Sequence, residues 1–170
     1  QWPQVQAPVD VHVFEGWCVD ARPQTDAELE SPINALERDC DPDGTWRRFV
    51  NEALSRGYQQ LFSRLHMLVL LEAPSFDVVY RWRVEQEHKL RDRSADPSLR
   101  IMSDEQIARF ISHYERLTRH ILTEMPPRAD IVVKLDEERS PIDIKRRNSR
   151  GERGRGFSRR DAEPAEKKSL

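Results

Sequence analysis

Glu15 is the first residue of the chain whose type and position could support chemistry. It follows residues 9–14, in which β-branched and polar residues alternate, and it precedes Gly16. This pattern predicts a short strand that ends in a turn, with the carboxylate at the carboxyl end of the strand. Ligands of open α/β sheets bind outside the carboxyl ends of parallel strands. A glutamate here therefore predicts a ligand site, although it could also simply cap the next turn.

The elements that would position such a site begin with a loop that contains short helical pieces, one of them over residues 33–38. Apolar residues then recur at three- and four-residue steps from Trp46 to Leu65, which predicts an amphipathic helix. Gly57 inside this helix indicates a kink or close packing. The continuous apolar run 67–71 predicts a strand buried on both faces, as in a parallel sheet covered by helices.

Two more helices and a last strand follow. Ser75 can cap a helix that becomes strongly charged, and Ser103 with Gln106 forms a capping-box pattern at the start of another. Residues 130–136 have the composition of a strand. The order of strands and helices predicts an α/β protein with a parallel sheet and flanking helices.

Composition separates the two ends of the chain from its middle. Of 170 residues, 37% are hydrophobic and 34% are charged. Residues 145–170 contain 10 Lys and Arg against 4 Asp and Glu, a charge of +6 in a chain whose net charge is −2. We expect residues 142–170 to be a disordered Arg/Gly-rich tail and residues 1–8 to be a linker, with one domain over residues 9–141.

The cellular setting is predicted from what the composition excludes. The two cysteines, Cys18 and Cys40, are too few for a disulfide framework, and free thiols favour a reducing, cytoplasmic location. No apolar run reaches the roughly 18 residues that a membrane span needs. The amino terminus lacks the pattern of a signal peptide and begins with Gln1, so we expect the chain to start inside a larger protein.

Five motifs resemble, in the same order, those of P-loop small-molecule kinases of the D-glycerate 3-kinase type, relatives of uridine and pantothenate kinases. They span roughly residues 9–141, and the ordered series is more specific than any single motif. The motifs are Phe14-Glu15-Gly16-Trp17, Val50-Asn51-Glu52-Ala53-Leu54 with Tyr58, Val79-Tyr80-Arg81-Trp82-Arg83 with Gln86 and Glu87, Met102-Ser103-Asp104-Glu105, and Leu135-Asp136-Glu137-Glu138-Arg139.

The resemblance implies a nucleotide-kinase fold that binds ATP and Mg²⁺ and phosphorylates a small hydroxylated metabolite, with D-glycerate the first candidate. Glu15 would stand near the metal and the γ-phosphate, where a carboxylate can hold a Mg²⁺-bound water or polarise the attacking hydroxyl. Arg81 and Arg83 would begin a lid helix, and guanidinium groups pair well with phosphate oxygens. They lie two residues apart, on different helix faces, so we favour Arg83 for direct contact. Arg83 and Glu87 could equally be an ordinary surface pair.

The same resemblance assigns the remaining site residues. Asn51 and Tyr58, seven residues apart on one helix face, would bind substrate hydroxyls or simply a neighbouring backbone. Trp17 would wall the substrate pocket, although a core tryptophan fits its position as well. Asp136 and Arg139 lie in the loop that resembles the adenine-contacting loop of these kinases, and Arg81 would also face the nucleotide.

One motif of these kinases is absent from the sequence. No Gly-x-x-x-x-Gly-Lys-Ser/Thr occurs, the loop whose backbone amides cradle phosphates. The resemblance places that loop upstream of the Glu15 strand. We therefore expect this chain to correspond to the carboxyl-terminal portion of such a kinase, incomplete for catalysis by itself. The alternative is a non-catalytic interaction module whose basic tail binds nucleic acid or acidic partners, but with one aromatic residue in the tail, nucleic acid is the weaker expectation.

Overall fold

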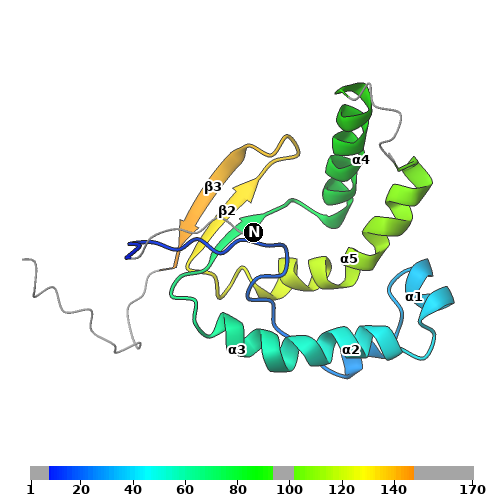
Figure 1. Ribbon diagram of the computed structural model, residues 1–170, viewed down its shortest axis with the longest axis horizontal. Helices are drawn as coiled ribbons and strands as arrows, with labels where there is room; N and C mark the ends of the chain where they lie inside the picture. Colours follow the sequence, from blue (N-terminus) through cyan, green and yellow to red (C-terminus); the bar gives the residue numbers. More distant parts are fainter. Residues whose placement is uncertain (1–7, 94–101, 148–170) are drawn as a thin grey trace, which may run out of the picture.

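The computed structural model describes residues 8–93 and 102–147, in which helices gather on one side of a three-stranded sheet (Figure 1). The α/β prediction is confirmed. The elements are the 3₁₀ helix η1 (Ala27–Leu29), α1 (Ala35–Cys40), α2 (Thr45–Ala53), the π-helical turn η2 (Leu54–Tyr58), α3 (Gln59–Phe62), β1 (Val69–Glu72), α4 (Phe76–Arg93), α5 (Asp104–Glu124), β2 (Ile131–Leu135) and β3 (Pro141–Arg146).

The sheet is mixed and not purely parallel. Its order is β1-β2-β3, with β1 parallel to β2 and β3 antiparallel to β2. β3 was not predicted, because its residues were assigned to the tail from residue 142 onward. That boundary is wrong for residues 142–146, which pair with β2 after a tight turn. The rest of the predicted tail, from residue 148, and the linker up to residue 7 lie outside the described residues.

The predicted strand over residues 9–14 is not formed. These residues are exposed and lie outside regular secondary structure. A strand exists only through hydrogen bonds to a neighbouring strand, and none of the described strands pairs with this segment. An alternating sequence pattern is therefore present without the partner that would turn it into a strand.

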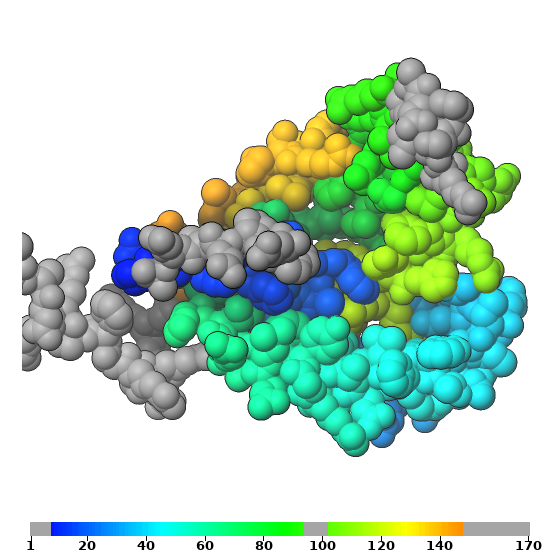
Figure 2. Space-filling view, viewed as in Figure 1, coloured from blue at the N-terminus to red at the C-terminus, as the bar shows by residue number. Residues whose placement is uncertain are grey.

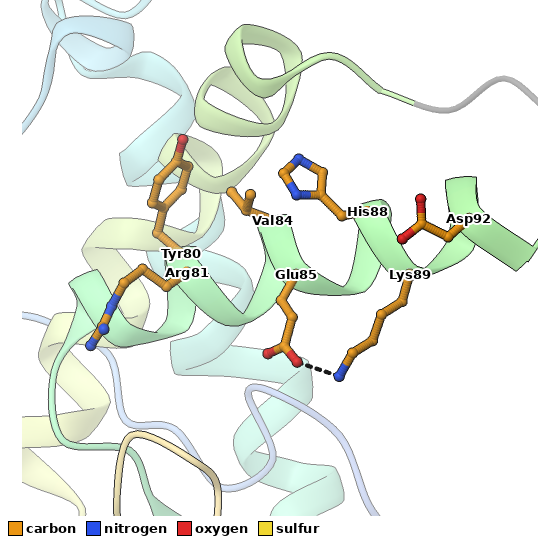
Figure 3. A pocket seen from close by; sticks show the side chains of 7 residues that line it. All are labelled: Tyr80, Arg81, Val84, Glu85, His88, Lys89 and Asp92. Atoms are coloured by element: carbon orange, nitrogen blue, oxygen red, sulfur yellow. Dashed lines mark hydrogen bonds and ion pairs between the residues drawn. The ribbon is translucent and has the colours of Figure 1, made fainter.

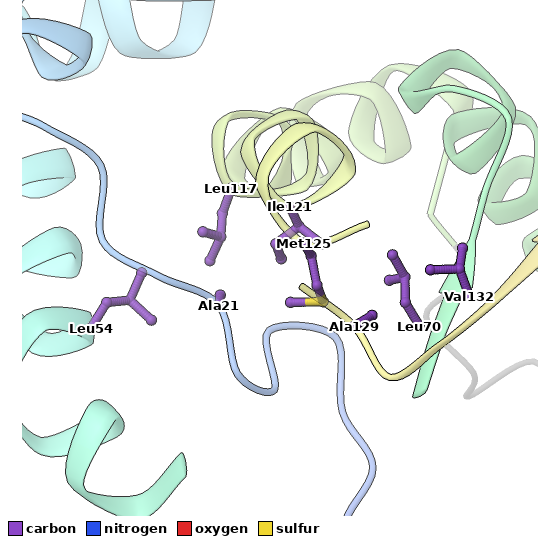
Figure 4. Packing of buried hydrophobic residues seen from close by; sticks show 8 residues of the cluster. All are labelled: Ala21, Leu54, Leu70, Leu117, Ile121, Met125, Ala129 and Val132. Atoms are coloured by element: carbon purple, nitrogen blue, oxygen red, sulfur yellow. The ribbon is translucent and has the colours of Figure 1, made fainter. Parts of the chain in front are cut away.

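The main core lies between the inner face of the sheet and the helices (Figure 4). α5 contributes Leu117 and Ile121, the strands contribute Leu70 and Val132, and Leu54 reaches the core from η2. On β1, however, Leu71 is 64% exposed. The prediction that β1 is buried on both faces is therefore wrong for the described residues, because helices cover only one face.

Local sequence signals place the helix ends as predicted. Ser103 accepts a hydrogen bond from the backbone N–H of Gln106, whose side chain returns to the Ser103 backbone, so the capping box of α5 is complete. The hydroxyl of Ser75 accepts from the N–H of Val78 at the start of α4. Such caps satisfy N–H groups that a helix cannot pair internally. A smaller cluster of Phe76, Ile107 and Ile111 joins α4 to α5.

None of the helices in residues 8–93 and 102–147 is both long enough and apolar enough to cross a membrane.

Candidate functional site

The turn between β2 and β3 is held against α4, which joins two of the predicted site segments. The indole N–H of Trp82 donates to the carbonyl of Glu137 at 2.6 Å. Arg139 donates to the Glu85 carboxylate at 2.7 Å, and its guanidinium carbon lies 5.2 Å from the centre of the Trp82 ring. Figure 2 shows the orange end of the hairpin in direct contact with the green helix. Three independent contacts therefore fix Arg139 beside the first half of α4.

Asp136 organises this turn from within. Its carboxylate accepts hydrogen bonds from the backbone N–H groups of Glu138, at 3.0 Å, and Ser140, at 2.7 Å. Arg139 has a positive φ of 68°, a conformation that costs energy for a residue with a Cβ. The Asp136 carboxylate compensates for that cost by closing the turn. Asp136 therefore stabilises the turn, and Arg139 is the residue of the turn whose side chain lies beside α4.

Arg81 and Arg83 leave α4 on different sides, as their spacing predicts. Arg81 pairs with the Glu137 carboxylate at 2.8 Å. It borders a shallow hollow of about 330 Å³ together with Glu85 and Lys89 (Figure 3). Hydrogen bonds from Lys89 and then Arg139 lower the pKa of Glu85, so this side of α4 keeps a carboxylate at neutral pH.

Arg83 lies on the side of α4 that faces α5. Its guanidinium donates to Gln86 at 2.8 Å and pairs with Glu87, which is only 4% exposed. The guanidinium carbon also lies 5.5 Å from the centre of the Phe110 ring. The Nε of Arg83 is buried and has no hydrogen-bond partner among the described residues. Arg83 is thus more enclosed than a typical surface arginine, and one of its donors is unused.

Arg83 and Arg139 line the same groove. It has a volume of about 590 Å³ and runs along α4, with Trp82 and Leu90 on its wall and Ile111 contributed by α5. Two guanidinium groups beside an aromatic ring and apolar side chains suit a ligand that carries both phosphate and a planar ring. Arg83 and Arg139 lie in different sequence motifs, one on α4 and one in the turn between β2 and β3, and the fold brings them together.

Trp17 belongs to a row of aromatic side chains that leads to Arg83. Its indole N–H donates to Thr118 at 2.9 Å, and its ring meets that of Tyr114 edge-on at 4.8 Å. Tyr114 in turn lies 5.0 Å from Phe110, the ring beneath Arg83. The Glu15–Trp17 segment and Arg83 are therefore linked along one face of α5.

Glu15 itself is exposed and lies in an extended segment. Across the described ranges, no three His, Cys, Asp or Glu side chains gather in a way that could hold a metal ion.

Asn51 and Tyr58 are separated by an irregular helical turn. Both polar atoms of the Asn51 side chain bond the backbone of Gln24, at 2.7 and 2.9 Å, which is the backbone alternative raised by the sequence. Tyr58, which is 46% exposed, is the last residue of the π-helical turn η2 that follows Asn51. Such turns are rare and occur often at functional sites. Gly57, which indicated a kink, lies inside it.

Comparison with known proteins identifies relatives of the chain. It is 34% identical to an uncharacterized kinase, mug58, of Schizosaccharomyces pombe over 116 residues, which is 67% of this chain and 39% of that protein. It is 29% identical to the chloroplastic D-glycerate 3-kinase of Arabidopsis thaliana over 157 residues, which is 83% of this chain and 29% of that protein. The chain is a relative of the D-glycerate 3-kinase type of kinase. No family model matches it.

The fold agrees with that of a D-glycerate 3-kinase. The structure of this enzyme from Cryptococcus neoformans superposes with a TM-score of 0.63 and 22% identity, over 84% of this chain and 51% of that chain. The YGR205w protein superposes with a TM-score of 0.50, over 78% of this chain and 46% of that chain. The chain thus spans about half of these solved structures, and 29–39% of the two curated relatives.

Three side chains of this candidate site were not singled out from the sequence. Trp82 carries both the hairpin contact and the stacking of Arg139. Phe110 and Tyr114, both on α5, connect Trp17 with Arg83. Their spacing on a helix is that of any apolar face, so only a contact with another element distinguishes them.

Proposed function

We propose that this chain forms part of an ATP-dependent kinase that phosphorylates a small hydroxylated metabolite, with D-glycerate the first candidate. The observation that carries the proposal is the convergence of Arg83 and Arg139 on one groove. The curated relatives support it, since one is named a kinase and the other a D-glycerate 3-kinase. The likeness to the Cryptococcus structure supports the fold on which the proposal rests.

Arg83 and Arg139 are the phosphate-binding groups in this proposal. Guanidinium groups form paired hydrogen bonds with phosphate oxygens and neutralise charge on a transferring phosphoryl group. Arg83 has a buried Nε without a partner among the described residues, and Arg139 pairs with a half-exposed carboxylate that can rotate away. Arg81 lies on the neighbouring side of the helix and faces the nucleotide only if its pair with Glu137 opens.

Glu15, Trp17, Asn51 and Tyr58 belong to the acceptor side of the proposal. ATP is used with Mg²⁺, which screens phosphate charge, and we assign Glu15 to the metal through a bound water or to the acceptor hydroxyl. Trp17 walls the acceptor pocket. Asn51 is engaged with Gln24, so of the two helix residues Tyr58 is the freer to contact a substrate.

The proposal concerns a protein that also supplies a phosphate-binding loop. This chain contains no such sequence motif and spans less than two thirds of its relatives. Activity, acceptor and partners therefore belong to the whole kinase. A cytoplasmic location is part of the same proposal, supported by the two free cysteines of the chain.

An ATP-consumption assay of the complete kinase tests the proposal. D-Glycerate and a panel of other hydroxylated metabolites are offered as acceptors, with Glu15→Gln and Arg83→Lys as variants. Arg83→Lys keeps the charge beside Glu87 but loses the planar fork, so we expect kcat to fall at least about tenfold with the fold intact. Glu15→Gln should also lower kcat.

Arg56→Lys is the matched control. Arg56 forms the same kind of i,i+4 pair, with Glu52 at 2.7 Å, but lies on η2 and does not line the groove. We expect this variant to retain full activity. ATP consumption that does not respond to any hydroxylated acceptor, or an equal loss in Arg56→Lys and Arg83→Lys, would contradict the proposal.

A further inference from the structure

Three side chains of α5, which we call the α5 row, lie between the two parts of the candidate site. They are Phe110, Tyr114 and Thr118, and their four-residue spacing places them one above the other along the helix. The guanidinium carbon of Arg83 lies 5.5 Å from the centre of the Phe110 ring, and Thr118 accepts the indole N–H of Trp17 at 2.9 Å. One end of the α5 row therefore contacts the phosphate-binding side, and the other end contacts the acceptor side.

The core fixes α5 toward both ends of this row. Ile107 and Ile111 belong to the cluster that joins α5 to α4, and Leu117 and Ile121 belong to the main core, into which Figure 4 shows them reaching. All four side chains are buried. Side chains carried by a helix that is packed in this way are held more precisely than side chains on a loop.

Trp17 is oriented by the α5 row. The residues that lead to it, 11–16, lie outside regular secondary structure, so they do not orient its side chain by themselves. The indole is held by its hydrogen bond to Thr118 and by the edge-on contact with Tyr114 at 4.8 Å. Thr118 is only 7% exposed, so water competes little for this bond, whereas Trp17 is 47% exposed and keeps surface for a ligand.

Phe110 has the same relation to Arg83. The guanidinium of Arg83 bonds Gln86 and Glu87, which both belong to α4, the helix that carries Arg83 itself. Phe110 contacts the guanidinium from α5. The stacking therefore relates the position of Arg83 to the helix that also holds Trp17.

We propose that the α5 row consists of positioning residues that fix the acceptor-binding and phosphate-binding side chains relative to each other. Thr118 orients Trp17, Phe110 orients Arg83, and Tyr114 connects the two, with its ring 4.8 Å from that of Trp17 and 5.0 Å from that of Phe110. Phosphoryl transfer needs the attacking hydroxyl and the phosphate in line, and a misplacement of about 1 Å lowers the rate strongly. The inference rests on the proposed function, which assigns Trp17 to the acceptor and Arg83 to phosphate.

Substitutions along the row test this role in the complete kinase, with D-glycerate as the acceptor. Thr118→Val keeps the shape but removes the hydroxyl, so the KM for the acceptor should rise about three- to tenfold with little change in kcat. Phe110→Leu removes the ring beside Arg83, so kcat should fall about three- to tenfold with little change in that KM. Tyr114→Leu should change both values. The affinity for a non-hydrolysable ATP analogue, measured by calorimetric titration, should fall in Phe110→Leu but not in Thr118→Val.

Matched variants separate positioning from a general loss of structure. Thr118→Ser keeps the hydroxyl and should bring the acceptor KM back toward that of the unmodified kinase. Thr123→Val makes the same change on the same helix, where the hydroxyl of Thr123 donates to the carbonyl of Arg119 at 3.1 Å. Phe49→Leu removes a ring that meets Trp46 on α2, at 6.3 Å between centres. Both of these controls should behave as the unmodified kinase does.

Three results would overturn the inference. They are equal effects of Thr118→Val and Phe110→Leu on both KM and kcat, an acceptor KM that Thr118→Ser does not restore, and an unchanged affinity of Phe110→Leu for the ATP analogue. A kinase that uses no hydroxylated acceptor would contradict the proposed function instead. The titration with the ATP analogue would then still decide whether Phe110 positions Arg83.

Discussion

Arginines play contrasting roles in two regions of the molecule. Around the loop that precedes α2, Arg47 and Arg116 donate to backbone carbonyls as well as to carboxylates. Arg47 bonds the carbonyls of Leu29 and Glu30 besides the Asp41 carboxylate. Arg116 bonds the carbonyls of Glu28 and Ser31 besides the Glu37 carboxylate. These two arginines therefore bond directly to the backbone of this loop.

In the groove region, Arg83 and Arg139 pair chiefly with side chains. Their partners are Gln86, Glu87 and Glu85. A side chain can rotate away from an arginine, whereas a backbone carbonyl can leave only if the loop unfolds. The comparison separates arginines that bond the backbone of a loop from arginines that bond side chains, and of the latter Arg139 is the more available to a ligand, because the partner of Arg83, Glu87, is itself buried.

Removal of Arg47 should have the largest effect on stability. Its side chain is 3% exposed and lies 3.1 Å from the Asp41 carboxylate. Arg47→Met removes the guanidinium from that carboxylate and from three backbone carbonyls, those of Leu29, Glu30 and Asp41, so we expect a loss of about 3–5 kcal/mol in the free energy of unfolding. Urea denaturation measures it. A loss below about 1 kcal/mol would contradict the structural role assigned to Arg47.

The Glu37–Arg116 pair should show a pH-dependent effect of intermediate size. Burial raises the pKa of Glu37, but hydrogen bonds from Arg116 and from the backbone N–H of Ile33 outweigh it and lower the pKa below its usual value. The ionised carboxylate therefore stabilises the folded chain at neutral pH. This contribution is lost as the pH falls through the lowered pKa, because the carboxylate then becomes protonated.

The matching variant is Glu37→Gln. We expect it to cost about 1–3 kcal/mol at pH 7 and to approach the unmodified chain as the pH falls below the lowered pKa of Glu37. Thermal denaturation across this pH range measures both values. A difference that stays constant with pH would show that the charge of Glu37 does not contribute.

Arg139→Met should change stability little and ligand affinity strongly. Its partner Glu85 is half-exposed, so the pair contributes less than about 1 kcal/mol to the free energy of unfolding. The affinity of the complete kinase for ADP should fall about tenfold, as expected for the loss of a charge-assisted contact to phosphate. Calorimetric titration provides the affinity. Unchanged binding would place Arg139 with the structural arginines.

Truncation at the carboxyl end should have the smallest effect, if it is made at the right residue. Removal of residues 148–170 should leave the free energy of unfolding and ADP binding unchanged. Removal from residue 145 should destabilise the chain, since Arg147 pairs with Asp130 at 2.7 Å and residues 145 and 146 pair with β2. A loss of ADP binding on removal of residues 148–170 would mean that the tail belongs to the nucleotide site.

The sequence by itself determined the helices, because their signals are local. The Ser103–Gln106 capping box and the Ser75 cap act within one turn, and both are observed. The same is true of the different sides taken by Arg81 and Arg83. The apolar steps from Trp46 to Leu65 predicted a helical segment that is formed as α2, η2 and α3, but the predicted apolar face is not buried throughout, since Trp46 and Phe49 are 66 and 63% exposed. The assignment to glycerate kinase-type relatives is also confirmed, since it rests on the order of short motifs and not on their contacts.

The sequence also predicted β1 and β2, from residues 67–71 and 130–136, but only the tertiary structure decided the third strand and the site. Residues 9–14 have the alternation of a strand but no partner among the described strands, whereas residues 142–146 pair with β2 although their composition indicated a tail. A strand depends on a neighbour distant in sequence, which no local pattern encodes. For the same reason Glu15, Arg83 and Arg139 could be proposed singly, but the groove and the aromatic row arise only where Trp82 meets the hairpin and Phe110 meets Arg83.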